Sequence, residues 1–514
     1  DMPSINNQEE YPTWVGFVFI FNLIVGTGAL ALPAAFAKTG WALSTILIVI
    51  LAFMSYLTVT FVIESMACAN AIQNWKRLQF LKRDQYQIGS NIEYPEQHHN
   101  AGHSDNDRDD GFGDEDTERP LLSTDNESTN IEQTPLNIMY NRNVYYSLTK
   151  KVELGEMAHL FFNSFGRILF YLCLVIYLYG DLSIYTAVVA KSLRDVICTN
   201  HNNQSSNDTV DAIELCWDNH TFSRLDIYRI CLIFFIAILG PFVFFNVQKT
   251  KYLQLLTVLF RWMAFSVMIC IAIHRLFSNE VPVQPKVADF NGIPYMVGAS
   301  IYSFMCHHSL PSLLTPISNK KQLTSVITWD FVLICTFYLL LALTGLFAFA
   351  DIRDLYTLNF LPNSDHDSFF LKIVEYFLAL FPVFTLSTSF PIIGITLKNN
   401  LQSLFLDAAL IDSYNFFLRR FFFPILTIIP PLCVTFFTES VQSLVDFTGC
   451  YAGTGIQYLI PAYLVYMARK SCSRLIGQGI VNEYSSPFKS NFWLFLILTW
   501  TITCLIFVTI DQFN

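Results

Sequence analysis

Charged residues are scarce in this sequence. Asp, Glu, Lys and Arg together make up only 14% of its 514 residues, whereas 53% are hydrophobic and 16% are aromatic. So few charges exclude an ordinary soluble globular protein of this length. The composition instead predicts an all-α polytopic membrane protein, because a chain that crosses lipid must satisfy its backbone hydrogen bonds within itself.

Motifs of catalysis and of metal binding are also missing. The sequence has no Gly-rich phosphate loop with its Lys, no His-Glu-x-x-His and no nucleophile elbow. Its twelve cysteines form no paired Cys-x-x-Cys array. We therefore expect neither an enzyme nor a structural zinc site, and no organic cofactor.

Long apolar runs are abundant, in contrast. A run of roughly 20 mainly apolar residues can cross about 30 Å of hydrocarbon as a helix. Eleven such runs lie near residues 13–36, 41–68, 165–195, 226–246, 252–277, 292–316, 324–350, 369–397, 416–437, 442–467 and 490–510. We number these predicted spans 1 to 11, and we expect span 1 to act as the targeting element.

The net charge of −10 is concentrated in one segment. Residues 84–135 hold 14 Asp and Glu against two Arg, which leaves the rest of the chain slightly basic. A segment so acidic and poor in apolar residues predicts a disordered loop that can recruit cytosolic proteins. The expected organisation is spans 1–2 at 1–68, an acidic, disordered cytosolic loop at 69–155, spans 3–5 at 156–277, spans 6–10 at 278–467, and a cytosolic loop with span 11 at 468–514.

Charged loops also predict the orientation. Lys and Arg recur in alternate loops, in "NWKRLQFLKR", "QKTK", "NKK" and "RKSCSR", which places those loops and the N-terminus in the cytosol and the C-terminus outside it. The loop 196–225 falls on the other side, where glycosylation and disulfides form. There we expect glycosylation of its three sequon asparagines and one disulfide between its two cysteines: Asn203, Asn207, Asn219, Cys198 and Cys216. Lysosomal, endosomal and plasma membranes all remain open.

Two predicted spans carry helix-weakening residues in their middle. Span 1 contains "IVGTGALALP" at 24–33, and span 6 contains "SFMCHHSLPSLLTPI" at 303–317. Because they lie five spans apart, they enter the membrane from opposite sides, as in transporters built from two inverted repeats of five helices. The alternative is a pair of kinked helices whose glycines serve packing.

The same segments resemble a known family. "NLIVGTGALALPAAFAKTGW" and "SFMCHHSLPSLLTPI" resemble the first and sixth helices of the amino acid and auxin permease group. Together with "YLYGDLSIY", "GPFVFFNVQKTKYLQ" and "GCYAGTGIQYLIPA", they resemble the transmembrane protein 104 family over almost the whole chain except the acidic loop. The resemblance implies amino acid transport by the fold of the bacterial leucine transporter, with five plus five inverted-repeat helices and one more.

The interruptions predict a substrate site. Half-helix N-termini favour carboxylates and unwound carbonyls favour cations. We expect an amino acid carboxylate at the amides of Thr27, Gly28 and Ala29, and its amino group near the break of span 6. The candidate residues there are Ser303, Cys306 and His307.

Sodium-coupled relatives of the group also imply a cation site. Its counterparts here are Asn22 in span 1 and two hydroxyl residues of span 8, Thr385 and Ser389. These hydroxyls share one helical face at i and i+4. The alternative is that they bond back to carbonyls of their own helix.

Ionisable residues at membrane depth are further candidates for coupling. Asp181 in span 3 and Arg261 in span 5 either pair with each other or leave one group facing the substrate, and His308 lies beside His307 at the break of span 6. The alternatives are a structural ion pair and histidines that cap free carbonyls. Three residues nearer span ends are expected at the membrane interface: Glu64, Asp330 and Glu375.

These patterns predict a secondary active transporter of amino acids or similar small zwitterions, a symporter if sodium is coupled. A small-molecule substrate and the lipid bilayer are then its partners, and no nucleic acid is expected. The alternative is an amino acid sensor or scaffold that does not transport and recruits proteins through residues 84–135. No ring of charges or carbonyl filter favours a channel.

Overall fold

The computed structural model describes most of the predicted membrane region. The described residues are 10–90, 145–198, 214–217, 222–244, 251–278, 284–361, 369–406, 416–477 and 480–513. This part of the chain is helical, with two isolated β-bridges and no strand, in agreement with the predicted all-α class. Residues 91–135, for which disorder and protein partners are expected, are outside the described residues. The three sequons are outside them as well.

The first predicted span is broken as expected. Helix α1 covers Thr13–Ile24 and helix α2 covers Gly28–Thr39, with a bend of 52° between them. The sixth span is broken as well, into α10 at Ile293–Ser303 and α11 at Leu310–Leu314. Gly and Ser have poor helix propensity and Pro311 lacks an amide hydrogen, so these segments lose little by leaving the helix.

Eight helices of the described part, or nine if α1 and α2 count as one, are long and apolar enough to cross a membrane. The eight lie in α3 (Trp41–Ser90), α6 (Ser164–Ile197), α8 (Arg224–Leu239) with η1 (Gly240–Phe244), α9 (Lys251–Phe277), α12 (Leu323–Ala348), α13 (Phe369–Phe405), α14 (Phe423–Phe437) and α17 (Asn491–Phe513). Predicted spans 6 and 10 consist of shorter pieces. Span 10 is built from α15 (Val441–Phe447), the π-helical turns η7 (Thr448–Gly453) and η8 (Gly455–Leu459), and α16 (Ile460–Leu475). Eleven crossings and the inverted repeat therefore stay predictions.

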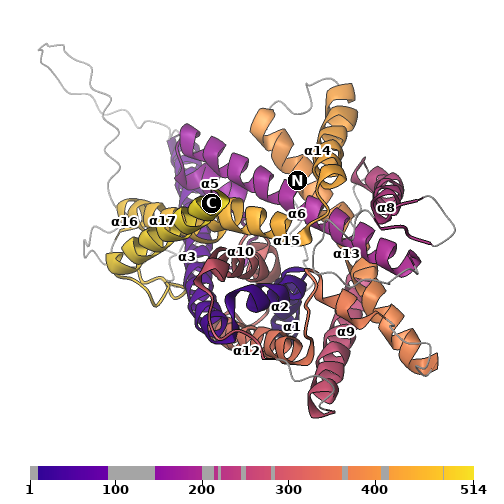
Figure 1. Cartoon of the computed structure of the whole chain (residues 1–514). Coiled ribbons are helices and arrows are strands. Elements are labelled where there is room, and N and C mark those ends of the chain that lie inside the picture. The colour runs from indigo at the N-terminus through magenta and orange to yellow at the C-terminus, as the bar shows by residue number, and fades with distance from the viewer. Residues whose placement is uncertain are drawn as a thin grey trace, which may run out of the picture.

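The two broken spans lie side by side within the bundle. Helix α10 packs against α2 and also against α3, α15 and η7, while α12 packs against α1, α2 and α3. Figure 1 shows α2 and α10 adjacent, with α3 and α12 beside them. On the other side α6 packs along α13 and α14. The two broken spans thus pack against each other and share α3 as a neighbour.

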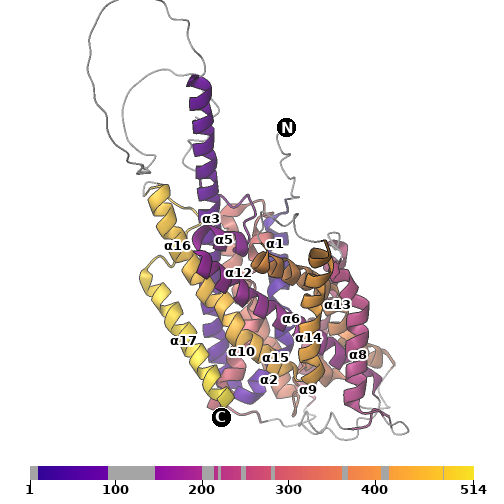
Figure 2. The same cartoon turned by 90° about the horizontal axis from the view of Figure 1, so that it is seen from above.

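Helix α3 is longer than the predicted second span. It continues past residue 68 to Ser90, so the expected disorder of the loop 69–155 is wrong for its first residues. The extension projects beyond the other helices, at the end of the bundle opposite to the C-terminal end of α17 (Figure 2). Its sequence "WKRLQFLKR" consists largely of good helix formers, which explains why the helix does not stop at the end of the apolar run. A second helix, α5 at Leu154–Phe161, lies at the end of the predicted loop.

Candidate functional site

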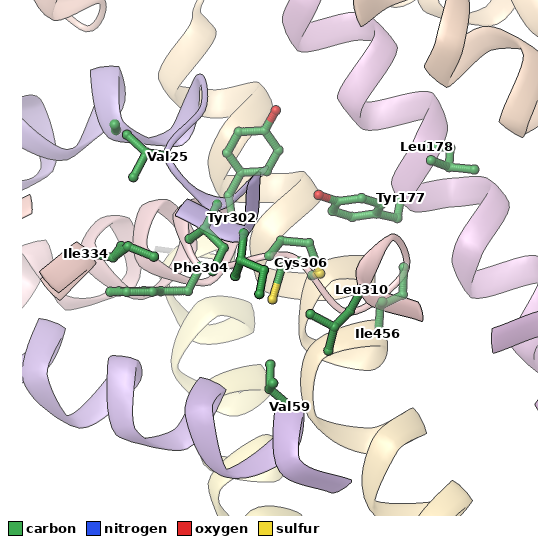
Figure 3. Packing of buried hydrophobic residues seen from close by; sticks show 14 of the residues in the cluster. Val25, Val59, Tyr177, Leu178, Tyr302, Phe304, Cys306, Leu310, Ile334 and Ile456 are labelled. Carbon is green, nitrogen blue, oxygen red and sulfur yellow. The ribbon is translucent and has the colours of Figure 1, made fainter. Parts of the chain in front are cut away.

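The breaks of the first and sixth spans touch each other. A Cβ atom on Gly28 would lie 2.6 Å from both Cα and Oγ of Ser303, so only glycine permits this approach. Tyr338 of α12 joins the two breaks, because its hydroxyl lies 2.9 Å from the carbonyl oxygens of Ile24 and Ser303. Figure 3 shows Val25 of the first break, Tyr302 near the end of α10, and Phe304 and Cys306 of the second break. We call this region the central site.

The break between α1 and α2 leaves two amides without an acceptor. Gly26 donates its amide to the Ile24 carbonyl at 2.9 Å, and Ala29 donates to the Gly26 carbonyl at 3.3 Å. The amides of Thr27 and Gly28, both in the described residues, make no such bond. They lie at the N-terminal end of α2, where aligned peptide dipoles favour an anion. Of the three predicted carboxylate-binding amides, Ala29 is therefore already engaged.

Asp181 of α6 reaches the central site through a tyrosine. The Tyr302 hydroxyl donates to Asp181 Oδ1 at 2.6 Å. Since its only proton goes to Asp181, Thr27 Oγ1 donates to the same phenol oxygen, at 3.1 Å. Asp181 is 4% exposed and, among the described residues, forms no ion pair. A buried carboxylate is thus connected by two hydrogen bonds to the side chain of Thr27, whose backbone amide is one of the two without an acceptor.

Arg261 of α9 does not pair with Asp181. Its Nη1 donates to the carbonyl oxygen of Asn22 at 2.5 Å and to that of Val25 at 3.0 Å. The interpretation of Asp181 and Arg261 as an ion pair is therefore wrong in this structure. Both residues contact the central site separately, one through a phenol and one through the backbone.

The predicted sodium residues are only partly free. Asn22 Oδ1 is buried and has no hydrogen-bond partner in the described part of the chain. Thr385 donates to the Phe381 carbonyl at 3.0 Å, and Ser389 donates to the Thr385 carbonyl at 3.3 Å. Both hydroxyls therefore make the bonds to their own helix that the alternative interpretation expected. Sodium binding by these residues stays a prediction.

The histidines at the second break have different surroundings. His307 is fully buried, and its Nε2 lies 2.9 Å from Thr58 Oγ1 of α3. The partly buried His308 faces Tyr177 of α6, with 5.6 Å between the ring centroids. Cys306, also buried, lies between them and the end of α10. The His307 ring also contacts the backbone of Ser55 in α3, and a coupling role for either histidine stays a prediction.

Three acidic residues expected at the membrane interface are buried within the protein. Glu64 forms two hydrogen bonds of 2.8 Å with Arg469 of α16, and Glu375 is 8% exposed. Asp330 of α12 is inaccessible, and neither of its oxygens has a hydrogen-bond partner among the described residues. Their expected depth at the membrane interface stays a prediction.

Two functional candidates were not foreseen from the sequence. Tyr302 and Tyr338 supply the hydroxyls that connect the helix breaks, α6 and α12. Each lies in an apolar helix, where a tyrosine is an ordinary packing residue. The only sequence signal is the position of Tyr302 directly before the interrupted segment 303–317.

The predicted disulfide is present. Cys198, at the end of α6, is bonded to Cys216, with 4.7 Å between the Cα atoms. It lies next to a set of charges in which the buried Asp195 accepts hydrogen bonds from three arginines, Arg194, Arg224 and Arg353. Arg194 also bonds Glu439 at 2.7 Å. We call these five residues the ion-pair network.

Comparison with known proteins gives consistent matches. A family model described as "Transmembrane amino acid transporter protein" matches residues 11–79 and 142–507. "Transmembrane protein 104 homolog" of Drosophila melanogaster is 53% identical over 525 residues and covers 99% of both chains. "Transmembrane protein 104" of Homo sapiens is 45% identical over 509 residues, with 98% of this chain and 96% of the relative covered. A Dictyostelium discoideum homolog is 34% identical, with 97% and 96% covered.

Proposed function

The chain belongs to the transmembrane amino acid transporter family and, within it, to the transmembrane protein 104 family, and we propose that it is a secondary active transporter of amino acids or similar small zwitterions. The substrate binds at the central site. Its carboxylate accepts hydrogen bonds from the amides of Thr27 and Gly28, at the positive end of α2. Its ammonium group binds the carboxylate of Asp181.

One observation carries this proposal. Asp181 and Thr27 are hydrogen-bonded to the same oxygen of Tyr302. A carboxylate and a helix N-terminus therefore lie within two hydrogen bonds of each other, a separation that suits the adjacent ammonium and carboxylate groups of an amino acid. Both have unused capacity, since Asp181 lacks a cationic partner among the described residues and the two amides lack acceptors. Burial away from water strengthens such bonds.

Uptake by proteoliposomes tests the proposal. The purified protein is reconstituted and given a panel of labelled amino acids, together with an amine that lacks the carboxylate and an acid that lacks the amine. We expect uptake of at least one amino acid and of neither truncated compound, and loss of uptake in Asp181→Asn. A protein that carries no member of the panel contradicts the proposal.

A sensor or scaffold is the competing function. It rests on the acidity of residues 84–135, which hold 14 Asp and Glu against two Arg. Deleting residues 91–135 leaves α3 intact and distinguishes the two. A transporter keeps its flux in this variant, whereas a sensor keeps ligand binding and loses its protein partners.

We also propose that the disulfide end of α6 lies outside the cytosol, because oxidising compartments permit disulfides. The N-terminus is then cytosolic and, with eleven spans, the C-terminus is not. Peptide N-glycosidase is expected to increase the electrophoretic mobility of the mature protein. Joint replacement of Asn203, Asn207 and Asn219 removes this shift; a shift that persists contradicts the orientation.

A further inference from the structure

We propose that Arg261 takes the place of a bound cation at the break of the first span, so that the protein needs no sodium ion there. The inference concerns the ion coupling of the transport proposed above. It rests on that function only for its transport readout, because its main test measures the protein's own stability.

Arg261 makes the contacts that a bound metal cation would make at the end of α1. The two carbonyls that accept its hydrogen bonds, Asn22 at 2.5 Å and Val25 at 3.0 Å, lie at the end of α1, where the chain leaves the helix. Carbonyls in the last turn of a helix lack amide partners and carry its negative partial charge. The guanidinium therefore binds the oxygens that an interrupted helix offers to a coupling ion.

The charge of Arg261 is not used elsewhere. Within the part of the chain that the structure describes, no carboxylate forms an ion pair with it, and Asp181 binds Tyr302 instead. An arginine inside a membrane protein is costly without a counter-ion, and its guanidinium stays protonated. A permanent positive charge is thus held against the end of α1 by backbone dipoles, and it repels a second cation at the same carbonyls.

Most of the predicted sodium ligands already take part in hydrogen bonds within the protein. The carbonyl oxygens of Asn22 and Val25 are occupied by Arg261, and the hydroxyls of Thr385 and Ser389 donate to their own helix. Among these predicted ligands, all of them described residues, Asn22 Oδ1 is the buried side-chain atom without a hydrogen-bond partner. Removing the guanidinium would free two carbonyls beside this amide oxygen, which creates an oxygen-lined space for a small cation where the native protein has none.

Thermal unfolding of the full-length protein in detergent tests this. Melting temperatures are compared in sodium chloride and in choline chloride at equal ionic strength. The wild-type protein is expected to melt at the same temperature in both salts. Arg261→Ala is expected to melt lower in choline and to recover specifically with sodium.

Arg275→Ala is the matched control. Arg275 lies in the last turn of the same helix, with its guanidinium 4.7 Å from the centroid of the Phe349 ring. This variant is expected to lose stability equally in the two salts. A sodium-specific gain in Arg275→Ala as large as in Arg261→Ala overturns the proposal.

Two further variants guard against a failure to fold. Arg261→Lys keeps the charge and should stay indifferent to sodium, whereas the neutral Arg261→Gln should acquire the sodium effect. Specific stabilisation of the wild type by sodium overturns the proposal, as does a folded neutral variant without a sodium effect. If uptake is found, replacing sodium by choline should leave its rate unchanged; an absence of any uptake counts against the transport function and leaves the thermal result valid.

Discussion

Two groups of charges in this molecule have different kinds of partner. In the ion-pair network, Asp195 accepts hydrogen bonds of 2.7 Å from Arg194 and Arg224 and of 3.4 Å from Arg353. In the central site, Asp181 binds one phenol and Arg261 binds two backbone carbonyls. The network is complete within the protein, whereas the charges of the central site have no charged partner among the described residues.

We expect the ion-pair network to stabilise the fold and the charges of the central site to bind a ligand. Removing one member of a buried ion pair leaves its partner uncompensated, so the network is expected to support the fold. A buried carboxylate without a cation can instead bind a cationic group of a ligand. The two groups should therefore respond oppositely to matched substitutions.

The largest effect is expected for Asp195→Asn. It removes the charge shared by three arginines, and breaking a buried pair costs about 3–5 kcal/mol of unfolding free energy. Asp181→Asn makes the same chemical change in the central site, where no ion pair is lost. Thermal unfolding of both variants should show a large decrease only for Asp195→Asn. Equal decreases would remove the proposed distinction.

A slightly smaller loss is expected for the disulfide beside the network. Cys198 and Cys216 are 18 residues apart, and closing a loop of about 15 residues stabilises by about 3 kcal/mol in the chain-entropy account. Joint replacement of both by Ser should lower the melting temperature and leave ligand affinity unchanged. Thiol labelling without reductant gives a second measurement, and ready labelling of both native cysteines would show that the bridge does not form.

Gly28→Ala tests the contact between the helix breaks. Its Cβ would lie 2.6 Å from the Cα of Ser303, a backbone atom that cannot move aside cheaply. Forcing such a contact costs about 1–3 kcal/mol, and transport should be lost with it. Gly26→Ala is the control, because its Cβ would meet nothing closer than the Ile24 carbonyl oxygen at 4.0 Å. Similar losses in both variants would mean that backbone freedom, rather than close approach, explains these glycines.

Tyr302→Phe should have the smallest effect on stability and a clear effect on binding. It removes the hydroxyl that positions Asp181 and Thr27, and loss of one such hydrogen bond, about 1.4 kcal/mol, corresponds to about a tenfold weaker affinity. Tyr338→Phe removes contacts with two backbone carbonyls instead and should mainly lower the melting temperature. The comparison needs affinity and unfolding measurements on both variants; a reversed pattern would contradict the assigned roles.

The sequence predicts local features of this fold well. The breaks of α1–α2 and α10–α11 follow from Gly, Ser and Pro within apolar runs. The disulfide follows from two cysteines in one loop with sequons. Each of these depends on residues close in sequence, whose conformational preferences or pairing are readable without the tertiary structure.

Side-chain contacts between helices that are distant in the sequence could not be predicted in this way. Arg261 and Asp181 have the charges of an ion pair, yet the guanidinium binds two backbone carbonyls. These carbonyls are free to accept a hydrogen bond only because α1 ends at this point. Tyr302 becomes a candidate site residue only because the fold brings its hydroxyl within hydrogen-bond distance of Asp181. Helical periodicity cannot tell which of several apolar neighbours a side chain will face.

The most direct test of the central claim is ligand binding to the purified wild-type protein and to Asp181→Asn. Each is unfolded thermally in the presence of a panel of amino acids. If the central site binds a zwitterion, at least one amino acid raises the melting temperature of the wild type, and Asp181→Asn, although folded, shows no such rise. An equal rise in both proteins would contradict the assignment of Asp181 as the ligand for the ammonium group.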